Sequence, residues 1–370
     1  MTGSTDWTSV AATIDPSGLA PDGPDSMGRE ICEGPAAVEA TLAGLAGGAI
    51  GRVVREAMRV VLIGTGASFA MCEAAAPFFA RPRAIVREAS SIVFDDLDGQ
   101  PIKRGDVAVA VSMSGASPET RAASVLARRA GATVVAVTAR ADSPLAGSAD
   151  HVVLTPIGEE TGAATKSELT AFAALAALAG ALPTEPGAVA QLRAQLAATA
   201  GDLAPMVVDA EAVVRARTCW TLGFGPAFGL ARAAALLLQE KARRPAVPCT
   251  PSEFRHGPIE AAGPEDVVFL VDAGAPQSRA RDLYLDRLTA ELATLGIPLV
   301  VVGRTGGLPA PAGSSPAVTV LHALLRVQQL ARVAAIAGGS YREDFLVLRT
   351  VVGAADDLFE SIRDNAVPES

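Results

Sequence analysis

One glycine-rich pattern occurs twice in the chain, each time leading into an Ala- and Leu-rich segment of helical composition. The first copy is Leu62-Ile-Gly64-Thr-Gly66-Ala-Ser68-Phe69, and the second is Thr221-Leu-Gly223-Phe-Gly225-Pro-Ala227-Phe228. Gly64 and Gly223 lie 159 residues apart, which is about one domain length. A strand that turns through glycine into a helix is a building unit of doubly wound α/β folds. The repeat therefore predicts two similar α/β domains in tandem.

Short apolar runs of strand length alternate with segments of helical composition. The strands expected in the first half are 59–63, 84–87, 107–111, 133–138 and 151–154, and those in the second half are 267–271 and 299–302. Helices are expected at 118–130, 166–180 and 321–336. Near-continuous apolar strands that alternate with helices indicate parallel sheets covered on both faces. The expected fold class is α/β, with two doubly wound parallel sheets.

The pattern also suggests domain boundaries. Residues 1–26 are polar and rich in Pro, Gly and Ser, and are expected to form a flexible N-terminal lead. The first domain is expected at 27–185, beginning with a helix broken early at Gly34-Pro35, and a linker at 186–204 follows. The second domain is expected at 205–345 and a C-terminal tail at 346–370.

Composition excludes several classes of protein. Half of the 370 residues are hydrophobic and only 4% are aromatic, which excludes a coiled coil, a collagen and a mostly disordered chain. A net charge of −9 argues against nucleic acid or an acidic membrane surface as the main partner. The N-terminus carries no secretory signal pattern, and the apolar stretch 169–182 is too short to span a bilayer. We expect a cytoplasmic protein.

The cysteines and lysines limit the chemistry further. The four cysteines are widely spread and form neither a CxxC pair nor a metal-ligand spacing: Cys32, Cys72, Cys219 and Cys249. We therefore expect no metal and no redox cofactor. Lysine occurs only at Lys103, Lys166 and Lys241, so any mechanism that needs a lysine has three candidates.

A cluster of hydroxyl residues follows the expected strand 107–111. Its sequence is Ser112-Met113-Ser114-Gly-Ala-Ser117-Pro-Glu-Thr120, and it enters a helix. Hydroxyls and free backbone N–H groups at a helix N-terminus suit the terminal oxygens of a phosphate monoester. The alternative is a simple helix cap by Ser117 or Thr120, but a cap needs one hydroxyl and not four. The cluster predicts phosphate binding.

The junction from Gly64 to Ser68 allows two interpretations. Its glycines permit a tight turn and close approach of an anionic ligand to the following helix, or they serve the turn alone. A dinucleotide-binding pattern would need glycine at Phe69, although Glu88 lies about where a ribose-binding acid is expected. A dehydrogenase is therefore a distant alternative.

Two further segments carry polar side chains. The loop 158–167, with Ala163, Ala164 and Thr165, forms either a wall of the same pocket or a charged loop that caps a helix. Glu240 ends a helix, and Glu253 and His256 lie in a Pro- and Gly-flanked segment. A carboxylate and an imidazole are what proton transfer between adjacent sugar carbons and sugar-ring opening require. From spacing alone, an ion pair of Glu240 with Arg243 on a solvated helix end is the favoured interpretation.

These residues together resemble a known family. The motifs are Gly66-Ala-Ser68, Ser112-Met-Ser114-Gly-Ala-Ser117, Ala164-Thr165-Lys166-Ser167 and Glu253-Phe-Arg-His256-Gly-Pro. In this order the chain, from Met27 to about Val352, resembles the double-SIS (sugar isomerase) proteins. It is similar to the isomerase half of glucosamine-6-phosphate synthase, and to shorter glucosamine-6-phosphate deaminases and ketose–aldose isomerases.

The resemblance implies a role for each motif. The flavodoxin-like SIS domains would hold the sugar phosphate through Ser68, Ser112, Met113, Ser114 and Ser117. Glu240 would move the proton between C1 and C2, and His256 would open the sugar ring, commonly in the partner subunit of a homodimer. Ala163, Ala164, Thr165 and Glu253 would line the sugar.

Two departures from the family matter. The chain begins Met-Thr-Gly without the glutaminase part, so we expect no glutamine-dependent synthesis by this chain. Thr350 or Arg349 stands where the family has a tail lysine, which leaves enolisation without an imine, or binding without catalysis. The function expected is a sugar-phosphate aldose–ketose isomerase or deaminase. The alternative is a non-catalytic sugar-phosphate sensor.

Overall fold

The computed structural model describes residues 25–80, 83–94, 102–202, 206–275, 278–303 and 310–347. These residues form two compact units, each built on one parallel β-sheet. The first-sheet unit comprises 36–160, 166–191 and the described part of 344–370, and the second-sheet unit comprises 25–35, 161–165 and 192–343. The predicted fold class, two parallel-sheet α/β domains, is confirmed.

The first-sheet unit contains five parallel strands in the order β2-β1-β3-β4-β5. The strands are β1 (Arg59–Gly64), β2 (Ala84–Glu88), β3 (Asp106–Val111), β4 (Thr133–Thr138) and β5 (His151–Leu154). The helices assigned wholly to this unit are α3 (Ala49–Arg55), α4 (Ala67–Ala75), α5 (Ala89–Phe94), α6 (Pro118–Arg129), α7 (Pro144–Ser148) and α8 (Lys166–Leu178). All five strands agree with the predicted runs to within one residue at each end.

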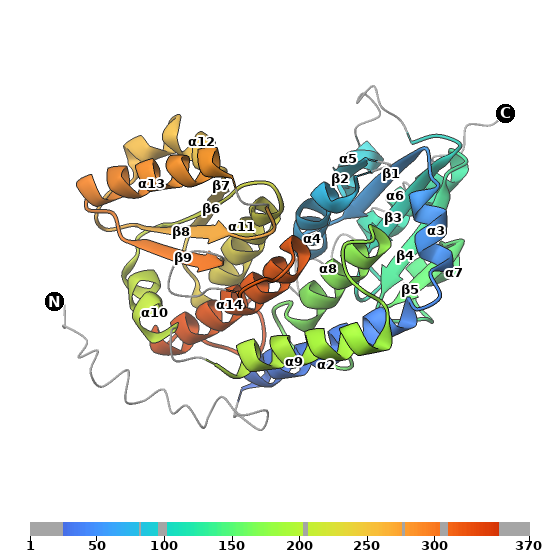
Figure 1. Ribbon diagram of the computed structural model, residues 1–370, viewed down its shortest axis with the longest axis horizontal. Coiled ribbons are helices and arrows are strands. Elements are labelled where there is room, and N and C mark those ends of the chain that lie inside the picture. Colours follow the sequence, from blue (N-terminus) through green and yellow to red (C-terminus); the bar gives the residue numbers. More distant parts are fainter. Residues whose placement is uncertain are drawn as a thin grey trace. The chain divides into compact units, whose positions relative to one another are not determined.

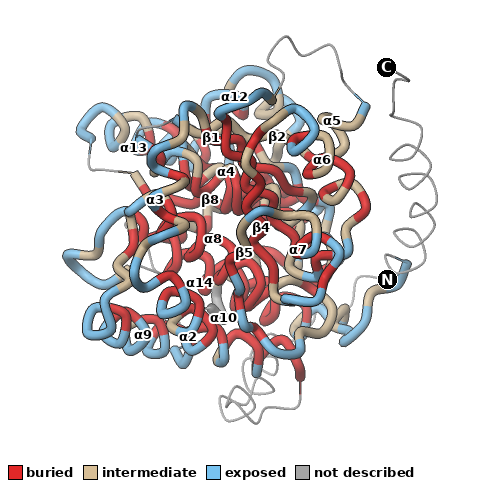
Figure 2. Tube along the Cα trace, turned by 90° about the vertical axis from the view of Figure 1, so that its right-hand side faces the viewer, coloured by how far each residue is buried: buried red, intermediate tan, exposed pale blue. Residues whose placement is uncertain are grey.

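Helices cover both faces of this sheet. On one face Val61, Ile63 and Ala108 pack with Ala123 and Ala127 of α6. On the other, α4 packs against α8, whose residues are all buried (Figure 2). Because both faces are covered, the strands carry apolar side chains at nearly every position, and this gave the sequence signal.

The second-sheet unit contains four parallel strands in the order β7-β6-β8-β9. The strands are β6 (Cys219–Gly223), β7 (Ala246–Cys249), β8 (Val267–Asp272) and β9 (Leu299–Gly303). The helices are α10 (Met206–Arg215), α11 (Pro226–Leu237), α12 (Pro251–Arg255), α13 (Arg279–Thr294) and α14 (Pro316–Ala337). Figure 1 shows α12 and α13 on one side of this sheet, and α10 and α14 on the other.

Strand β7 was not predicted from the sequence. It pairs only with β6 and therefore lies at the edge of its sheet, where Pro248 is tolerated despite its missing N–H. The core on the α13 side is formed by Trp220, Leu270, Leu288 and Phe254. The Trp220 and Phe254 rings meet edge to face with centroids 5.5 Å apart.

The two units are interleaved along the chain, unlike the contiguous domains expected. Helix α2 (Ser26–Gly44) continues through Pro35, so the expected break at Gly34-Pro35 does not occur. Helix packing outweighs the one N–H that proline removes, since Gly34 and Pro35 are both buried. The segment expected as a linker, 186–204, contains helix α9 (Pro186–Gly201).

One described helix, α14, is long and apolar enough to cross a membrane by length and composition. Helices α2 and α3 pass the same test only if taken together, and they are bent by 79° at their junction. Of the most apolar window of α14, 89% is buried inside the protein, which is usual for a core helix. Its buried face also carries His322, Gln328 and Arg332.

Candidate functional site

The predicted phosphate loops lie at the switch point of the first sheet. Strands β1 and β3 are neighbours, while β2 lies on the outer side of β1. After β1 the chain continues toward β2, and after β3 it continues toward β4 on the other side. The crevice between these two diverging connections, at the carboxyl ends of β1 and β3, is where open α/β sheets bind ligands. The structure places Ser68 after β1, and Ser112, Ser114 and Ser117 after β3.

The turn after β1 depends on two glycines. Gly66 has φ 57° and ψ −126°, a conformation that L residues avoid. A Cβ on Gly64 would lie 2.9 Å from the backbone N of Phe69, so the first turn of α4 packs directly against the end of β1. Ser68 occupies that first turn, where the backbone N–H groups are not used within the helix.

The loop after β3 is held from beneath. Backbone hydrogen bonds join Ser112 N to Val137 O at 3.0 Å and Ala139 N to Met113 O at 2.9 Å. The Thr138 hydroxyl also donates to Met113 O at 3.2 Å. Gly115 has φ 62°, and a Cβ there would collide with the Ser143 side chain. Ser112 is buried in this framework, and Ser114 is exposed at its surface.

Ser117 has the capping role that the sequence offered as an alternative. Its hydroxyl caps α6, accepting from Thr120 N at 3.4 Å, and donates to Glu119 Oε2 at 3.0 Å. The cap is thus present in the structure, but it occupies only Ser117. Ser68, Ser112 and Ser114 are not caps of α6, so the cap does not account for the other serines.

The loop Thr161–Thr165 belongs to the second-sheet unit, with the predicted sugar-lining residues Ala163, Ala164 and Thr165. The Glu30 carboxylate accepts from Thr161 N at 2.6 Å and from Thr165 Oγ1 at 3.0 Å. Gln328 Nε2 donates to Thr165 O at 2.9 Å.

Sequence reasoning did not single out Glu30 or Gln328. The available signal for Glu30 was its place in the family-like stretch that begins at Met27. The N-terminus of α8 is approached by Glu160, whose Oε1 accepts from Ser167 N at 2.9 Å.

Glu240 lies in a π-helical turn, Leu238–Ala242, that ends α11. Burial raises the pKa of its carboxyl to about 7, and the neighbouring Lys241 ammonium opposes this shift. Arg243 adopts the left-handed conformation, with φ 51°, and ends the turn. Among the described residues Glu240 forms no ion pair with Arg243, so it is not part of a solvated pair at the helix end.

Glu253 and His256 lie around α12 and are both exposed. The Glu253 carboxylate forms a capping box with Thr250, accepting from Thr250 N at 2.9 Å. His256 follows the helix, and its N–H donates to Glu253 O at 3.0 Å. The capping box gives Glu253 a structural role.

The other two histidines lie in a strand and in a helix. His151 starts β5. His322 is buried in α14, where its Nδ1 lies 2.7 Å from Thr199 Oγ1 and burial lowers its pKa to about 4. The tail positions Arg349 and Thr350 lie outside the described residues.

Comparison with known proteins finds a family match in the first half of the chain. The SIS domain family matches residues 54–181, which include β1, β3 and both serine-bearing loops. The chain contains a SIS domain. Glutamine–fructose-6-phosphate aminotransferase (isomerizing) of Pyrobaculum aerophilum is 32% identical over 253 residues, or 64% of this chain and 41% of the relative. The chain thus corresponds to less than half the length of that curated relative.

Solved structures extend the SIS similarity over both sheets. The C-terminal domain of glucosamine-fructose-6-phosphate aminotransferase from Francisella tularensis has a TM-score of 0.71 at 21% identity, covering 88% of this chain and 99% of that chain. Tagatose-6-phosphate ketose/aldose isomerase from Escherichia coli has a TM-score of 0.72 at 21% identity, covering 85% and 93%. The chain therefore has the fold of tandem SIS domains, and its structural neighbours include phosphosugar isomerases.

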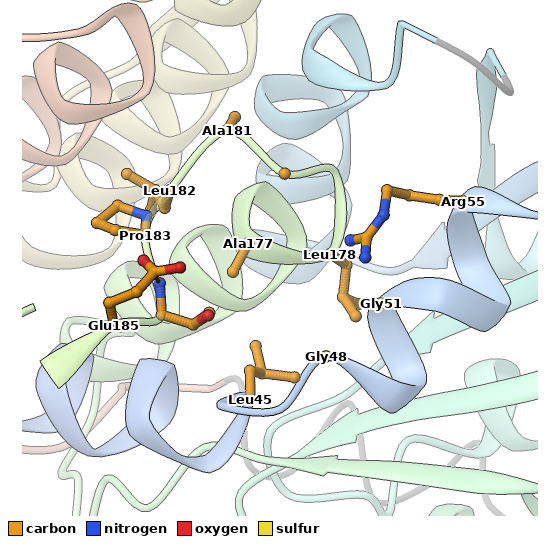
Figure 3. Close-up of a pocket in the computed structure, with 12 residues that line it drawn as sticks. Leu45, Gly48, Gly51, Arg55, Ala177, Leu178, Ala181, Leu182, Pro183 and Glu185 are labelled. Carbon is orange, nitrogen blue, oxygen red and sulfur yellow. Dashed lines mark hydrogen bonds between the residues drawn. The ribbon is translucent and has the colours of Figure 1, made fainter.

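A cavity of about 390 Å³ lies elsewhere in the first-sheet unit (Figure 3). It is lined by the turn before α3, by α3 itself, by the end of α8 and by the segment that follows α8, including Leu45, Arg55, Leu178 and Glu185. None of the predicted site residues lines it. Among the described residues, no group of three or more His, Cys, Asp and Glu side chains could hold a metal ion.

Proposed function

We propose that this SIS protein converts a sugar phosphate between its aldose and ketose forms, or deaminates an amino-sugar phosphate, by enolisation. Glu240 is the observation that carries the proposal. A carboxyl whose pKa is raised to about 7 can both accept and return a proton near neutral pH. A protein that only binds sugar phosphate has no need of such a group.

The serine loops support a phosphorylated substrate. Residues 66–68 and 112–117 present hydroxyls and helix N-terminal N–H groups at one switch point. Each hydrogen bond to a charged phosphate oxygen is worth about 1.5–3 kcal/mol, so these groups would favour a phosphate ester over the free sugar. Met113, whose carbonyl is engaged by Thr138, would contribute loop shape rather than a donor.

The proton transfer requires one base and two adjacent carbons. Glu240 removes the proton from the carbon next to the carbonyl, the bonding electrons form the C=C of an enediol, and the carbonyl oxygen takes up a proton from solvent. The same carboxylic acid then delivers its proton to the former carbonyl carbon, while the hydroxyl on the adjacent carbon loses its proton to solvent and becomes the new carbonyl. Ala163, Ala164 and Thr165, held by Glu30, would line the sugar, with Glu253 at its rim. The reaction needs neither metal nor redox cofactor.

We also propose that the protein works as a cytoplasmic homodimer. The His256 imidazole is exposed and makes no hydrogen bond to the described residues, so it is free to enter the site of a second subunit. There it would assist ring opening by moving a proton between ring oxygen and solvent.

Glu240→Gln tests the catalytic step, because it keeps the shape and removes the base. We expect isomerisation, followed as solvent deuterium incorporated at C1 or C2 of sugar 6-phosphates, to fall at least ~1000-fold. Ligand affinity should remain within a few-fold. Exposed Glu260→Gln is the matched control and should retain full activity. A wild type that binds sugar phosphates but exchanges no deuterium would instead support the sensor.

Two pH profiles test the raised pKa. The wild-type rate should rise with pH through about 7, because only the carboxylate accepts a proton. The stability should change in the opposite direction. A carboxyl whose pKa is raised on folding favours the folded state below about 4.5, and this contribution is lost as pH rises through about 7. Glu240→Gln should therefore gain thermal stability relative to wild type between pH 5 and 8.

A further inference from the structure

Lys241 is buried directly after the proposed base. Only 2% of its surface is exposed. Its ammonium donates to the backbone oxygens of Arg342, at 2.8 Å, and Glu343, at 3.2 Å. It also lies 5.2 Å from the centre of the Tyr341 ring. The side chain thus extends from the turn that carries Glu240 to the C-terminal segment 340–343.

The segment 340–343 is held to the same turn by other contacts. Ser340 Oγ donates to Lys241 O at 2.9 Å, so both ends of Lys241 bind the segment. The Tyr341 hydroxyl accepts from Met27 N at 3.3 Å, and Ser26 N donates to the Glu343 carboxylate at 3.2 Å. These partners all belong to the second-sheet unit.

The proposed sugar-lining loop, at Gly162, also packs closely against the Lys241 ammonium. A Cβ on Gly162 would lie 2.7 Å from Lys241 Nζ and would collide with Glu343 O. Gly162 has φ 75°, so glycine permits both the backbone conformation and the close approach. Any larger residue would push the loop away from the lysine.

Lys241 is buried among carboxylates. Burial lowers the pKa of its ammonium, and the carboxylates of Glu343, Glu30, Glu240 and Asp25 oppose this shift. Its protons are directed at two carbonyl oxygens, and an amine that attacks a sugar carbonyl would have to give up both hydrogen bonds. The surroundings therefore favour a fixed cation over a nucleophile.

We propose that Lys241 is a positioning residue of the Glu240 site. Its ammonium fastens the C-terminal segment 340–343 and the Gly162 loop to the π-helical turn and sets the charge that Glu240 experiences. The part that concerns Glu240 rests on the proposed function. The part that concerns the C-terminal segment is independent of any activity.

Lys241→Met, which keeps much of the length and removes the charge and the donors, tests both parts. Trypsin cleaves after Arg342, whose carbonyl is held by Lys241, and mass spectrometry follows the fragment that ends there. We expect this cleavage to be about tenfold faster than in wild type, because the segment opens more often. Exposed Lys103→Met should leave it unchanged.

The kinetic readout separates positioning from simple packing. Loss of the cation should move the acid limb of the kcat/KM profile upward by about 0.5–1 pH unit. Lys241→Arg keeps the charge, so its acid limb and its cleavage rate should both lie closer to wild type than those of Lys241→Met. The double variant Ser340→Ala/Tyr341→Phe keeps the cation, so its cleavage should be faster with no shift of the acid limb.

The outcomes decide each part separately. Unchanged cleavage in folded Lys241→Met would overturn the anchoring role, whether or not the protein turns over a sugar. Unchanged pH dependence in an active Lys241→Met would overturn the electrostatic role. If Lys241→Met does not fold, the double variant decides the anchoring role, and Lys241→Gln, which keeps a donor and removes the charge, decides the electrostatic one. An inactive wild type with faster cleavage in the variant would contradict the proposed function and keep the anchor.

Discussion

The two sheets have the same backbone turn at their switch points but different side chains around it. Gly66 and Gly225 have nearly identical backbone angles, φ 57° and ψ −126° against φ 55° and ψ −125°. Gly64 and Gly223 each lie so close to the following helix that a Cβ would collide with its backbone. The internal repeat is therefore a repeat of backbone geometry, required by the packing of strand on helix.

The side chains around the two turns differ. The first sheet has Ser68 after β1, and Ser112 and Ser114 after β3. At the equivalent places the second sheet has Ala227 after β6 and Asp272 at the end of β8. Asp272 is buried and pairs with Arg281 at 2.6 Å. The paired carboxylate stands where the first sheet has the Ser112 hydroxyl, so the second switch point lacks a donor that suits phosphate at that place.

At the ends of the helices that follow these turns, it is the second sheet that carries the candidate functional side chain. Helix α4 runs into the short 3-10 turn Ala76–Phe78, which contains Pro77, whereas α11 runs into the π-helical turn with Glu240. In the proposed function one repeat binds phosphate and the other supplies the base. The two sheets share the turn geometry, and a few side chains at strand and helix ends distinguish their proposed roles.

The largest effect is expected when the first switch point is given the charge of the second. Ser114→Asp should weaken sugar 6-phosphate binding by about 100–1000-fold, since it removes a donor and adds a repelling carboxylate. Calorimetry measures the affinity, and Ser114→Asn is the neutral control of similar size. Equal affinity of Ser114→Asp and wild type would place the phosphate elsewhere.

A smaller effect, on stability, is expected from breaking the Asp272–Arg281 ion pair in the second sheet. Asp272→Ala should lower the free energy of unfolding by about 3 kcal/mol, because it leaves the Arg281 charge largely buried without its partner. Denaturant titration measures this, and Asp272→Ala/Arg281→Met should recover much of the loss. Phosphate affinity should not change. If the phosphate affinity of Asp272→Ala falls as far as that of Ser114→Asp, phosphate binding is not confined to the first switch point.

The smallest effect compares the two glycines directly. Gly66→Ala and Gly225→Ala should each cost about 1–3 kcal/mol of stability from backbone strain, since no atom lies within 4 Å of either added Cβ. Only Gly66→Ala should also weaken phosphate binding, because it reorients the entry to α4. Unequal stability losses would mean that the shared backbone angles do not carry equal strain.

Much of this fold was accessible from the sequence because both sheets are covered on both faces. The runs 133–138 and 151–154 match β4 and β5 at both ends. Strand β7 escaped because an edge strand of four residues containing Pro248 lacks an apolar run. Helix α9 was expected as a linker because its small and polar residues do not show a strong apolar face.

The site was predictable only where chemistry and local sequence coincide. The serine loops could be found because hydroxyls follow a strand directly. Whether Ser117 caps α6 depends on side-chain angles, and the structure shows that it does. The partners of Lys241 could not be found, because Arg342 and Glu343 are about a hundred residues away in the chain and contribute backbone oxygens. Every residue has a backbone carbonyl, so a sequence pattern cannot indicate which one accepts a hydrogen bond.

The interleaving of the two units limits how this chain can be divided by genetic means. A fragment that starts after residue 191 would contain all four strands of the second sheet but neither Asp25 nor Glu30. Buried Arg332 would lose its carboxylate partner, and Gln328 would lose the Thr165 carbonyl. Such a fragment would expose unpaired polar groups on α14 and should not fold. Supplying residues 25–35 as a separate peptide would restore the Asp25 carboxylate, which makes this helix segment a natural tag for split-protein complementation.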